Sequence, residues 1–428
     1  MEKQNVLYFT SYPLDPDNGG GMAILNDISQ LSQLEKINLY VVVACQESSQ
    51  IKTRDQLDKL KVKYYLTTNF ISSTKKGNFL NRLVKTYEKV VRRLRATFSF
   101  QTVMYLPFEN YNQVEHVSKY LTYLCNRHSI HVVIVEQLYS ILWFKDFLNL
   151  KQRKIYLAFD REAEMIRSLA LNFARNDISS FFKFRIFIIS LRVSSFEKKV
   201  CKLANKCIFL SAADVPKYLL ANEKVLVNSQ VLPPKVMGWH YTNSMTVLFA
   251  GNIDYYFNSL AVKWLICELS PRLLRLNNQI KIVITGTDFN NMPKDWTIES
   301  NVHIPGFLPK KQLEDLFQTS DIFICPIDND FSVKMKLVEC VSYGIPFFAT
   351  EPCLKALPYL SGLPILDINS PDEAAAFICE TLSNKEVLEQ LSHQILEDAF
   401  NFAKTRKDWW TKVILESREF KIGGHYLD

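Results

Sequence analysis

Short apolar runs alternate with longer amphipathic stretches along most of this chain. Apolar runs bounded by turn residues predict buried strands, and apolar residues three or four positions apart predict helices. In the first half, the predicted strands cover residues 5–12, 37–45, 62–68, 131–138, 154–159 and 206–211, with a helix at 22–34. Strands that alternate with helices in this way predict an α/β fold built on a parallel sheet.

The pattern breaks at residues 231–244, where two prolines, a glycine and several polar residues predict a linker. A second series follows it, with strands at 246–251, 280–286, 302–308, 321–327 and 346–350 and helices at 259–276 and 310–319. A last helix, from about residue 398 to 420, carries Trp409 and Trp410. We therefore expect two Rossmann-like domains, residues 1–238 and 239–397, and a C-terminal helical segment, residues 398–428.

Composition narrows the class of protein only a little. A chain of 428 residues with 48% hydrophobic residues can form two or three domains. The net charge of +7 allows an anionic partner without demanding one. Nine scattered cysteines, with no C-x-x-C pair and no His/Cys metal spacing, predict reduced thiols and a cytoplasmic location. We expect no leader, and the longest apolar runs fall short of the ~20 residues that span a bilayer.

The segment from Ser332 to Thr350 carries the most informative chemistry. It follows a buried strand, and Lys334 and Lys336 stand at the start of the helix that comes next, with Glu339 one turn further on. Open α/β sheets bind ligands at the C-terminal ends of their strands, and a helix start with two lysines favours an anion. A carboxylate beside them can accept hydrogen bonds from a ribose, so the segment predicts a nucleoside diphosphate site. The alternatives are solvated lysines and a structural salt bridge at Glu339.

This segment resembles the donor-binding motif of the retaining glycosyltransferases of family 4, G-[ST]-G-x-[KR]-x-K-x-x-E-A-x-x-x-G-x-P-V-V-A-T. Three residues, Asp330, Phe331 and Ser332, replace its G-[ST]-G, and Cys340 replaces its alanine. The matching residues are Lys334, Lys336, Glu339, Gly344, Pro346, Ala349 and Thr350.

The resemblance implies the GT-B fold, in which two Rossmann-like domains flank a cleft and a C-terminal helix crosses back onto the first. It also implies transfer of a sugar with retention from a UDP- or GDP-linked donor, with no metal and no further cofactor. Lys334 and Lys336 would then stabilise the charge on the departing diphosphate.

Two glycine positions extend the predicted donor site. Gly20 and Gly21 lie between the first strand and the first helix, where the family has a P-x-x-G-G loop at its cleft. Without a Cβ atom, the backbone there can approach a ligand closely. A flexible turn is the alternative.

The second domain adds three more positions by the same reasoning. Gly251 and Asn252 close its first strand, where the family has a loop facing the donor phosphates, and Gly286 closes the next strand. Asn258 matches the asparagine of a family-like Y-x-P-N stretch, although Phe257 replaces the proline. A glycine after a strand is usually only a turn, so these positions are weak evidence alone.

Acidic residues follow two strands of the first domain. Asp160, Glu162 and Glu164 come after the strand at 154–159, and Glu136 ends the strand at 131–138. They can bind an acceptor or assist its deprotonation. Acids that complement a helix dipole are an equally good reading. Our catalytic candidates are Asp160, Glu162 and Lys336, and we assign no metal ligand.

Residues 75–95 carry eight Lys/Arg and one acid around an apolar stripe at helical spacing. A basic amphipathic helix is typical of proteins that bind an anionic membrane surface, and residues 181–192 add an apolar edge. The alternatives are a helix with a solvated basic face and nucleic-acid binding, which no recognised module supports.

We therefore predict a glycosyltransferase that acts on a glycan or lipid-linked acceptor, at the inner face of a membrane in surface polysaccharide or lipopolysaccharide assembly. A non-catalytic nucleotide- or glycan-binding protein and a nucleotide-sugar epimerase are the alternatives.

Overall fold

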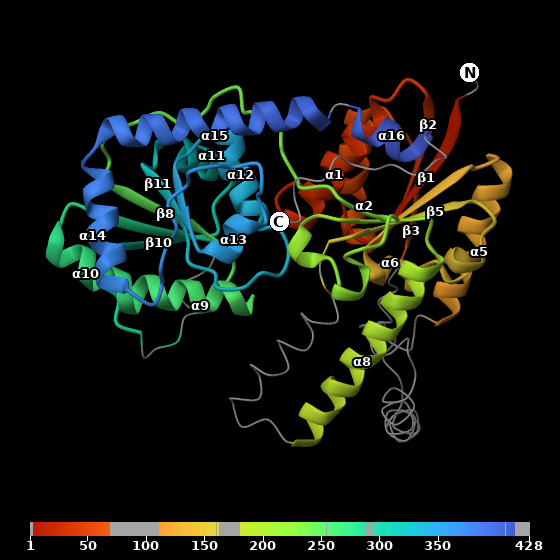
Figure 1. The fold of residues 1–428 in the computed structure, drawn as a ribbon, viewed down its shortest axis with the longest axis horizontal. Helices are drawn as coiled ribbons and strands as arrows, with labels where there is room; N and C mark the ends of the chain where they lie inside the picture. Colours follow the sequence, from red (N-terminus) through yellow and green to blue (C-terminus); the bar gives the residue numbers. More distant parts are fainter. Residues whose placement is uncertain are drawn as a thin grey trace. The chain divides into compact units, whose positions relative to one another are not determined.

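The computed structural model of the protein describes residues 3–68, 111–159, 161, 180–253, 255–286, 293, 296–406 and 408–415. These residues divide into two compact units. The first takes residues up to 210, 214–228 and those from 410 onward, and the second takes 211–213 and 229–409. Each unit holds one parallel sheet with helices packed on it (Figure 1).

The sheet of the first unit has seven strands in the order β3-β2-β1-β4-β5-β6-β7. All of its pairings are parallel. The strands are β1 (Gln4–Thr10), β2 (Ile37–Cys45), β3 (Lys63–Thr68), β4 (Val132–Glu136), β5 (Arg153–Ala158), β6 (Lys206–Phe209) and β7 (Val225–Val227). The chain runs outward from β1 in one direction and from β4 in the other. The order of strands therefore reverses between β1 and β4, which makes that junction the topological switch point.

Helices of the first unit lie on both faces of this sheet. They are α1 (Gly19–Ser32), α2 (Glu47–Leu60), α5 (Tyr111–Arg127), α6 (Gln137–Trp143) and α8 (Ser180–Leu203). Strands β2 and β4 are almost continuous apolar runs because both of their faces are covered. On the face of α5, α6 and α8, Leu7 and Phe9 join Val133 and Val135 in one buried core.

The sheet of the second unit has five parallel strands in the order β10-β9-β8-β11-β12. They are β8 (Thr246–Ala250), β9 (Lys281–Thr285), β10 (Val302–Gly306), β11 (Ile322–Cys325) and β12 (Phe347–Ala349). The strand order reverses between β8 and β11, so the switch point of this sheet lies there.

Helices cover both faces of the second sheet as well. They are α9 (Tyr256–Trp264), α10 (Ser270–Leu276), α11 (Lys310–Thr319), α12 (Met335–Tyr343), α13 (Glu351–Lys355), α14 (Pro371–Leu382) and α15 (Lys385–Arg406). Figure 1 shows α9 and α10 below this sheet, and α11, α12 and α15 above it. A π-helical segment, Leu265–Leu269, joins α9 to α10.

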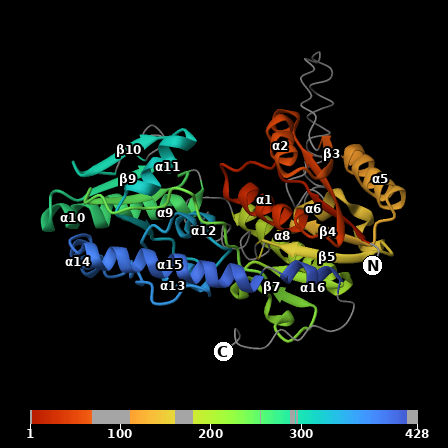
Figure 2. The same ribbon diagram turned by 90° about the horizontal axis from the view of Figure 1, so that it is seen from above.

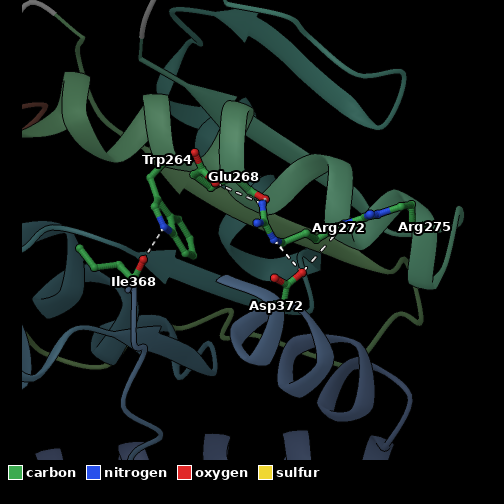
Figure 3. Close-up of polar contacts among 6 residues, drawn as sticks. All are labelled: Trp264, Glu268, Arg272, Arg275, Ile368 and Asp372. Atoms are coloured by element: carbon green, nitrogen blue, oxygen red, sulfur yellow. Dashed lines mark hydrogen bonds and ion pairs between the residues drawn. The ribbon is translucent and has the colours of Figure 1, made fainter. Parts of the chain in front are cut away.

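Polar contacts fix α14 to the α9–α10 layer, as Figure 3 shows. Arg272 Nε donates to Asp372 Oδ1 at 2.9 Å, and the same guanidinium pairs with Glu268 one turn before it. Trp264 Nε1 donates to the carbonyl oxygen of Ile368 at 2.9 Å. Asp372 lies in the first turn of α14, where a carboxylate also complements the helix dipole.

The C-terminal part of the chain differs in detail from the helix expected at 398–420. Helix α15 ends at Arg406, and a second helix, α16 (Trp409–Leu415), follows it. The Arg153 guanidinium, at the start of β5, donates to the carbonyl oxygens of Val413 and Ile414, both at 2.8 Å. This cation satisfies carbonyls in the last turn of α16, and it places α16 beside the sheet of the first unit (Figure 2).

Candidate functional site

The strongest candidate site lies at the switch point of the second sheet. Strands β8 and β11 pair side by side, so the turn after β8 and the loop after β11 leave the same edge of the sheet. Gly251 and Asn252 form that turn, and residues 326–334 form that loop before α12 begins at Met335. The sequence therefore folds as predicted here. Gly344 ends α12 in the left-handed conformation (φ 71°), and Pro346 precedes β12.

Lys336, in the first turn of α12, is the central cation of this site. Its ammonium donates to Asn258 Oδ1 at 2.8 Å and lies 4.4 Å from the centre of the Phe249 ring. Burial lowers the pKa of Lys336, and the nearby charge of Lys334 acts in the same direction. A partly desolvated ammonium of this kind interacts more strongly with an anion than a lysine in bulk water does.

Asn258 connects this lysine to the turn after β8. Its Oδ1 accepts from Lys336, and its Nδ2 donates to the carbonyl oxygen of Asn252 at 2.9 Å. In the sequence, the match to the Y-x-P-N stretch was the only signal for Asn258. The contact of Lys336 with Phe249 had no signal, because the two residues are far apart in the sequence.

Two glycines leave the room that this arrangement needs. A Cβ atom on Gly251 would lie 2.8 Å from Lys336 Nζ and 2.9 Å from two side-chain atoms of Asn258. Gly286 has φ +88°, and a Cβ atom on it would lie 3.1 Å from the backbone of Gly251. The structure thus brings together Gly251, Asn252, Gly286 and Lys336, four of the predicted donor-binding residues.

Lys334 has a different environment from Lys336. Its ammonium donates to Asn329 Oδ1 at 2.8 Å, to Ser332 O at 3.2 Å and to Phe331 O. Lys334 therefore stabilises the loop after β11 through hydrogen bonds to residues of that same loop. Ser332 has φ 60°, so it keeps the left-handed conformation that suits the last glycine of the family motif. Contact of Lys334 with a donor stays a prediction.

Glu339 lies one turn after Lys336 in α12 and is half-buried. Its backbone carbonyl accepts from Ser342 Oγ at 2.7 Å. Its contact with a ribose also stays a prediction.

The switch point of the first sheet carries acidic groups in place of basic ones. Glu136 ends β4 and is fully buried. Burial raises the pKa of Glu136 well above its usual range, and the negative charge of Asp27 on α1 raises it further. Burial raises the pKa of Tyr8 on β1, and the carboxyl group of Glu136 raises it further.

The residue after Glu136 adds a conformational cost. Gln137 has φ 60°, a left-handed conformation that a side chain disfavours. Nearby, Ser140 Oγ accepts from the backbone N–H of Ser11 at 2.8 Å and ties the turn after β1 to α6. A buried carboxyl group with a raised pKa, beside a disfavoured backbone conformation, marks this edge as a second candidate site.

The predicted glycine loop is not a loop in the structure. Gly19, Gly20 and Gly21 form the first turn of α1, where Asn18 Oδ1 accepts from the N–H of Gly21 at 2.7 Å. A Cβ atom on Gly21 would lie 2.2 Å from the carbonyl oxygen of Asp15. These glycines let residues 13–18 fold back onto the helix start, and their contact with a donor stays a prediction.

Lys52 holds the same folded segment from α2, because its ammonium pairs with Asp15 at 2.6 Å and with Asp17 at 2.5 Å.

Asp160 and Glu162, the predicted catalytic acids, lie outside the described residues, as do Glu164 and the basic stretch at 75–95. Within the described residues, no group of three or more His, Cys, Asp or Glu side chains is placed to hold a metal ion. Those residues also include no helix that is long and apolar enough to cross a membrane.

One protein family matches the part of the chain that forms the site around Lys336. Residues 244–384 match the family described as glycosyl transferases group 1, and this stretch includes the site around Lys336. No curated protein matches the chain.

Solved structures match the chain over nearly its whole length. TarM superposes with a TM-score of 0.66 at 10% identity, covering 96% of this chain and 98% of TarM. Anabaena Alr3699/HepE, solved with UDP and glucose, gives 0.60 at 12% identity, covering 96% and 99%. A putative UDP-N-acetylglucosamine 2-epimerase from Listeria monocytogenes gives 0.51 at 10%, covering 98% and 100%. These likenesses confirm the predicted GT-B fold.

Proposed function

We propose that this chain, a GT-B glycosyltransferase whose residues 244–384 match glycosyl transferases group 1, moves a sugar from a UDP- or GDP-linked donor to a glycan or lipid-linked acceptor. The observation that carries the proposal is the half-buried ammonium of Lys336, held by Asn258 at the switch point of the second sheet. Parallel sheets bind phosphorylated ligands at such points. Related structures support a UDP-linked donor, since HepE was solved with UDP and glucose and an S. aureus TarM mutant with UDP.

The chemistry that the chain supplies is mostly electrostatic. In the transfer, the bond between the anomeric carbon and the diphosphate oxygen breaks, a bond to the acceptor oxygen forms, and the acceptor proton leaves. The ammonium of Lys336, the amides at the start of α12 and Lys334 stabilise the charge that develops on the diphosphate. Their positive charge supports a reaction without a metal ion, and the family resemblance supports retention.

The remaining groups bind the two substrates. Glu339 accepts hydrogen bonds from the ribose, while Gly251, Asn252 and Gly286 lie against the donor phosphates. Asp160 or Glu162 receives the acceptor proton.

A peripheral membrane location would bring a lipid-linked acceptor to the enzyme, as surface polysaccharide or lipopolysaccharide assembly at the inner face requires. The basic stretch at 75–95 supports this, and so does α8, where Phe187 and Leu191 are 49% and 44% exposed. Figure 1 shows the N-terminal end of α8 extending beyond the sheet of the first unit.

Liposome sedimentation tests this part separately. We expect binding to vesicles that contain anionic lipid at low salt, and release when Lys85, Arg92, Arg93 and Arg95 are replaced by Glu. Binding that survives these four changes would show that the stretch is only a solvated face.

The decisive test of the proposed function is nucleotide release from a panel of donors. The protein is incubated with UDP-glucose, UDP-N-acetylglucosamine or GDP-mannose, with and without glycan or lipid extracts, and the free diphosphate and the product anomer are measured. We expect release that one donor supports and an acceptor accelerates, with the anomeric configuration kept.

The same panel separates the alternatives. Binding without release would identify a non-catalytic protein, which the Asp330–Phe331–Ser332 departure favours. A changed nucleotide sugar that forms without an acceptor would identify an epimerase. The putative epimerase from Listeria monocytogenes, which is similar in structure to this chain, motivates this alternative.

A further inference from the structure

Four aromatic rings gather beside the anion site of the second unit. Phe257, in the first turn of α9, is the central one and is 6% exposed. Its ring contacts three others, with centre-to-centre distances of 5.7 Å to Tyr255, 5.4 Å to Tyr256 and 6.2 Å to Phe331. Phe257 directly precedes Asn258, which holds the ammonium of the site, so the rings lie next to the candidate phosphate position.

Two of these rings stand where the family motifs have none. Phe257 replaces the proline of the Y-x-P-N stretch, and Phe331 replaces the middle residue of G-[ST]-G. The two positions are far apart in the sequence, yet their side chains meet between the start of α9 and the loop after β11. Because the two departures contact each other, together they alter one surface of the site.

The loop after β11 holds Phe331 at this surface. Asn329 Oδ1 accepts from the backbone N–H of Phe331 at 3.2 Å and from the ammonium of Lys334 at 2.8 Å. The carbonyl oxygen of Phe331 accepts from the same ammonium. Both backbone groups of Phe331 are therefore hydrogen-bonded within the loop. A side chain presented by such a fixed segment loses less conformational entropy when a ligand binds.

The order of residues along the chain indicates which part of a donor reaches Phe331. In the proposed function, on which this inference rests, the diphosphate lies at Lys336 and the ribose at Glu339, one turn further along α12. The sugar is joined to the end of the diphosphate opposite the ribose. It therefore lies on the side of the residues that precede α12, and Phe331 is one of them.

The ring of Phe331 offers apolar surface at this position. Phe331 is half-buried, and Tyr255 is 48% exposed. Burying a methyl group of a ligand against an aromatic ring is favourable because apolar area leaves water. A sugar hydroxyl group placed there would lose hydrogen bonds to water, and the ring returns no comparable one.

We propose that Phe331 is a specificity-determining residue for the transferred sugar, and that it favours a sugar carrying a methyl group, as a 6-deoxy or N-acetylated sugar does. Phe331 contacts the sugar, and Phe257 is a positioning residue that acts through Phe331. A serine or threonine at position 331, as in the family motif, would supply a hydroxyl group in place of the ring and would favour an unmodified, hydroxylated sugar.

The experiment is calorimetry on the full chain with donors that differ by one group. UDP, UDP-glucose, UDP-6-deoxyglucose and UDP-N-acetylglucosamine form one series, and GDP, GDP-mannose and GDP-6-deoxymannose form the other. Selectivity is the affinity for a methyl-bearing sugar divided by that for its parent. We expect wild type to bind at least one methyl-bearing sugar about fourfold or more tightly than its parent, which is the worth of one buried methyl group.

Three variants separate a sugar contact from a structural role. Phe331→Ser should abolish the selectivity and leave affinity for the bare diphosphate unchanged, whereas Phe331→Leu, which keeps apolar surface, should retain most of the selectivity. Phe307→Ser is the matched control. Phe307 follows β10 at the same edge of the sheet and is 77% exposed, so its replacement should change neither quantity.

The role of Phe257 is tested by combining substitutions. Phe257→Leu keeps an apolar residue but alters the support of the Phe331 ring, so it should reduce the selectivity. Added to Phe331→Ser, it should cause no further loss, because its effect passes through that ring. If Phe257→Leu does not fold, the two Phe331 variants still test the sugar contact.

The outcomes are distinct from those of the proposed function. Equal binding of methyl-bearing and parent sugars by wild type, or unchanged selectivity in Phe331→Ser, would overturn this inference and leave the transfer reaction standing. An equal loss of affinity for the bare diphosphate and its sugars in Phe331→Ser would also overturn it, since the ring would then only brace the loop. A wild-type protein that binds neither UDP, GDP nor any of these sugars would remove the proposed function and this inference together.

Discussion

The two sheets place a basic group and an acidic group at the same position of the same architecture. In the second unit, the switch point between β8 and β11 carries the ammonium of Lys336, half-buried and hydrogen-bonded to Asn258. In the first unit, the switch point between β1 and β4 carries the carboxyl group of Glu136, fully buried. Burial pushes both groups toward their neutral forms, since it lowers the pKa of Lys336 and raises that of Glu136.

The difference shows how one topology presents two kinds of chemical group at the same position. The position at the strand ends comes from the fold, but the ligand that binds there depends on the side chains delivered to it. An ammonium beside Gly251 suits a phosphorylated ligand. Burial favours the neutral form of the Glu136 carboxyl group, which can donate as well as accept a hydrogen bond.

The largest expected effect comes from adding one methyl group beside the ammonium. In Gly251→Ala, the new Cβ atom would lie 2.8 Å from Lys336 Nζ and displaces it from Asn258. We expect affinity for UDP, measured by calorimetry, to fall more than tenfold, because a charge-assisted bond is worth about 1.5–3 kcal/mol.

Gly362→Ala is the matched control. Gly362 has φ +65° and no heavy atom within 4 Å of a built Cβ, so the substitution adds backbone strain without touching the site. If both substitutions reduce UDP binding equally, the close approach at Gly251 has no role in ligand binding.

The next largest expected effect is on the pH dependence of folding stability, through Glu136 at the switch point between β1 and β4. The unfolded chain loses the Glu136 proton near the usual pKa of 4.5, whereas the folded chain keeps it to a higher pH. The contribution of Glu136 to the free energy of unfolding is therefore fully present below pH 4.5. It is lost as the pH rises from there to the raised pKa of the folded state, by about 1.4 kcal/mol per pH unit within that window.

Glu136→Gln removes this loss, so thermal melting should show the variant gaining stability over wild type as the pH rises from 4 to 8.

Asp15→Asn serves as the opposite case. Burial acts to raise the pKa of Asp15, but hydrogen bonds from Lys52 and from the Asp17 amide lower it overall. Its stabilisation is present above the usual carboxyl pKa and is lost as the pH falls. Parallel pH profiles for the two variants would contradict the raised pKa of Glu136.

The smallest expected effect is at the loop that departs from the family motif. Ser332 adopts φ 60°, which costs a side-chain-bearing residue about 1–2 kcal/mol that glycine does not incur. In Ser332→Gly, the greater conformational entropy of the unfolded chain offsets part of the stability gained by relieving this strain, by roughly 0.5–1 kcal/mol. We expect a net gain in the free energy of unfolding of under about 1 kcal/mol by urea titration. A clear loss would show that the Ser332 side chain stabilises the loop.

Local patterns in the sequence were sufficient for the elements around Lys336. The run before Cys325, the lysines that follow it and Gly344 with Pro346 predicted β11, α12 and β12 because strand, helix start and helix end each have a short-range signal. The break between α15 and α16 was missed, since apolar spacing continues across it.

Side-chain partners brought together by the fold could not be predicted. Glu136 meets Tyr8 and Asp27 only because β4 pairs with β1 and α1 covers that face. The two lysines looked alike in sequence, yet Lys334 binds its own loop while Lys336 binds Asn258. Their difference depends on the path of the loop after β11, which no periodicity encodes.

The central claim is that Lys336 makes the second switch point an anion site, and one calorimetric comparison tests it most directly. UDP, GDP and the nucleosides uridine and guanosine are titrated into wild type, Lys336→Ala and Lys355→Ala, the last removing an exposed lysine of α13. We expect the diphosphate that binds wild type to lose roughly 10- to 100-fold in affinity with Lys336→Ala, with its nucleoside and the Lys355→Ala protein unchanged. Equal diphosphate affinity in wild type and Lys336→Ala would contradict the account.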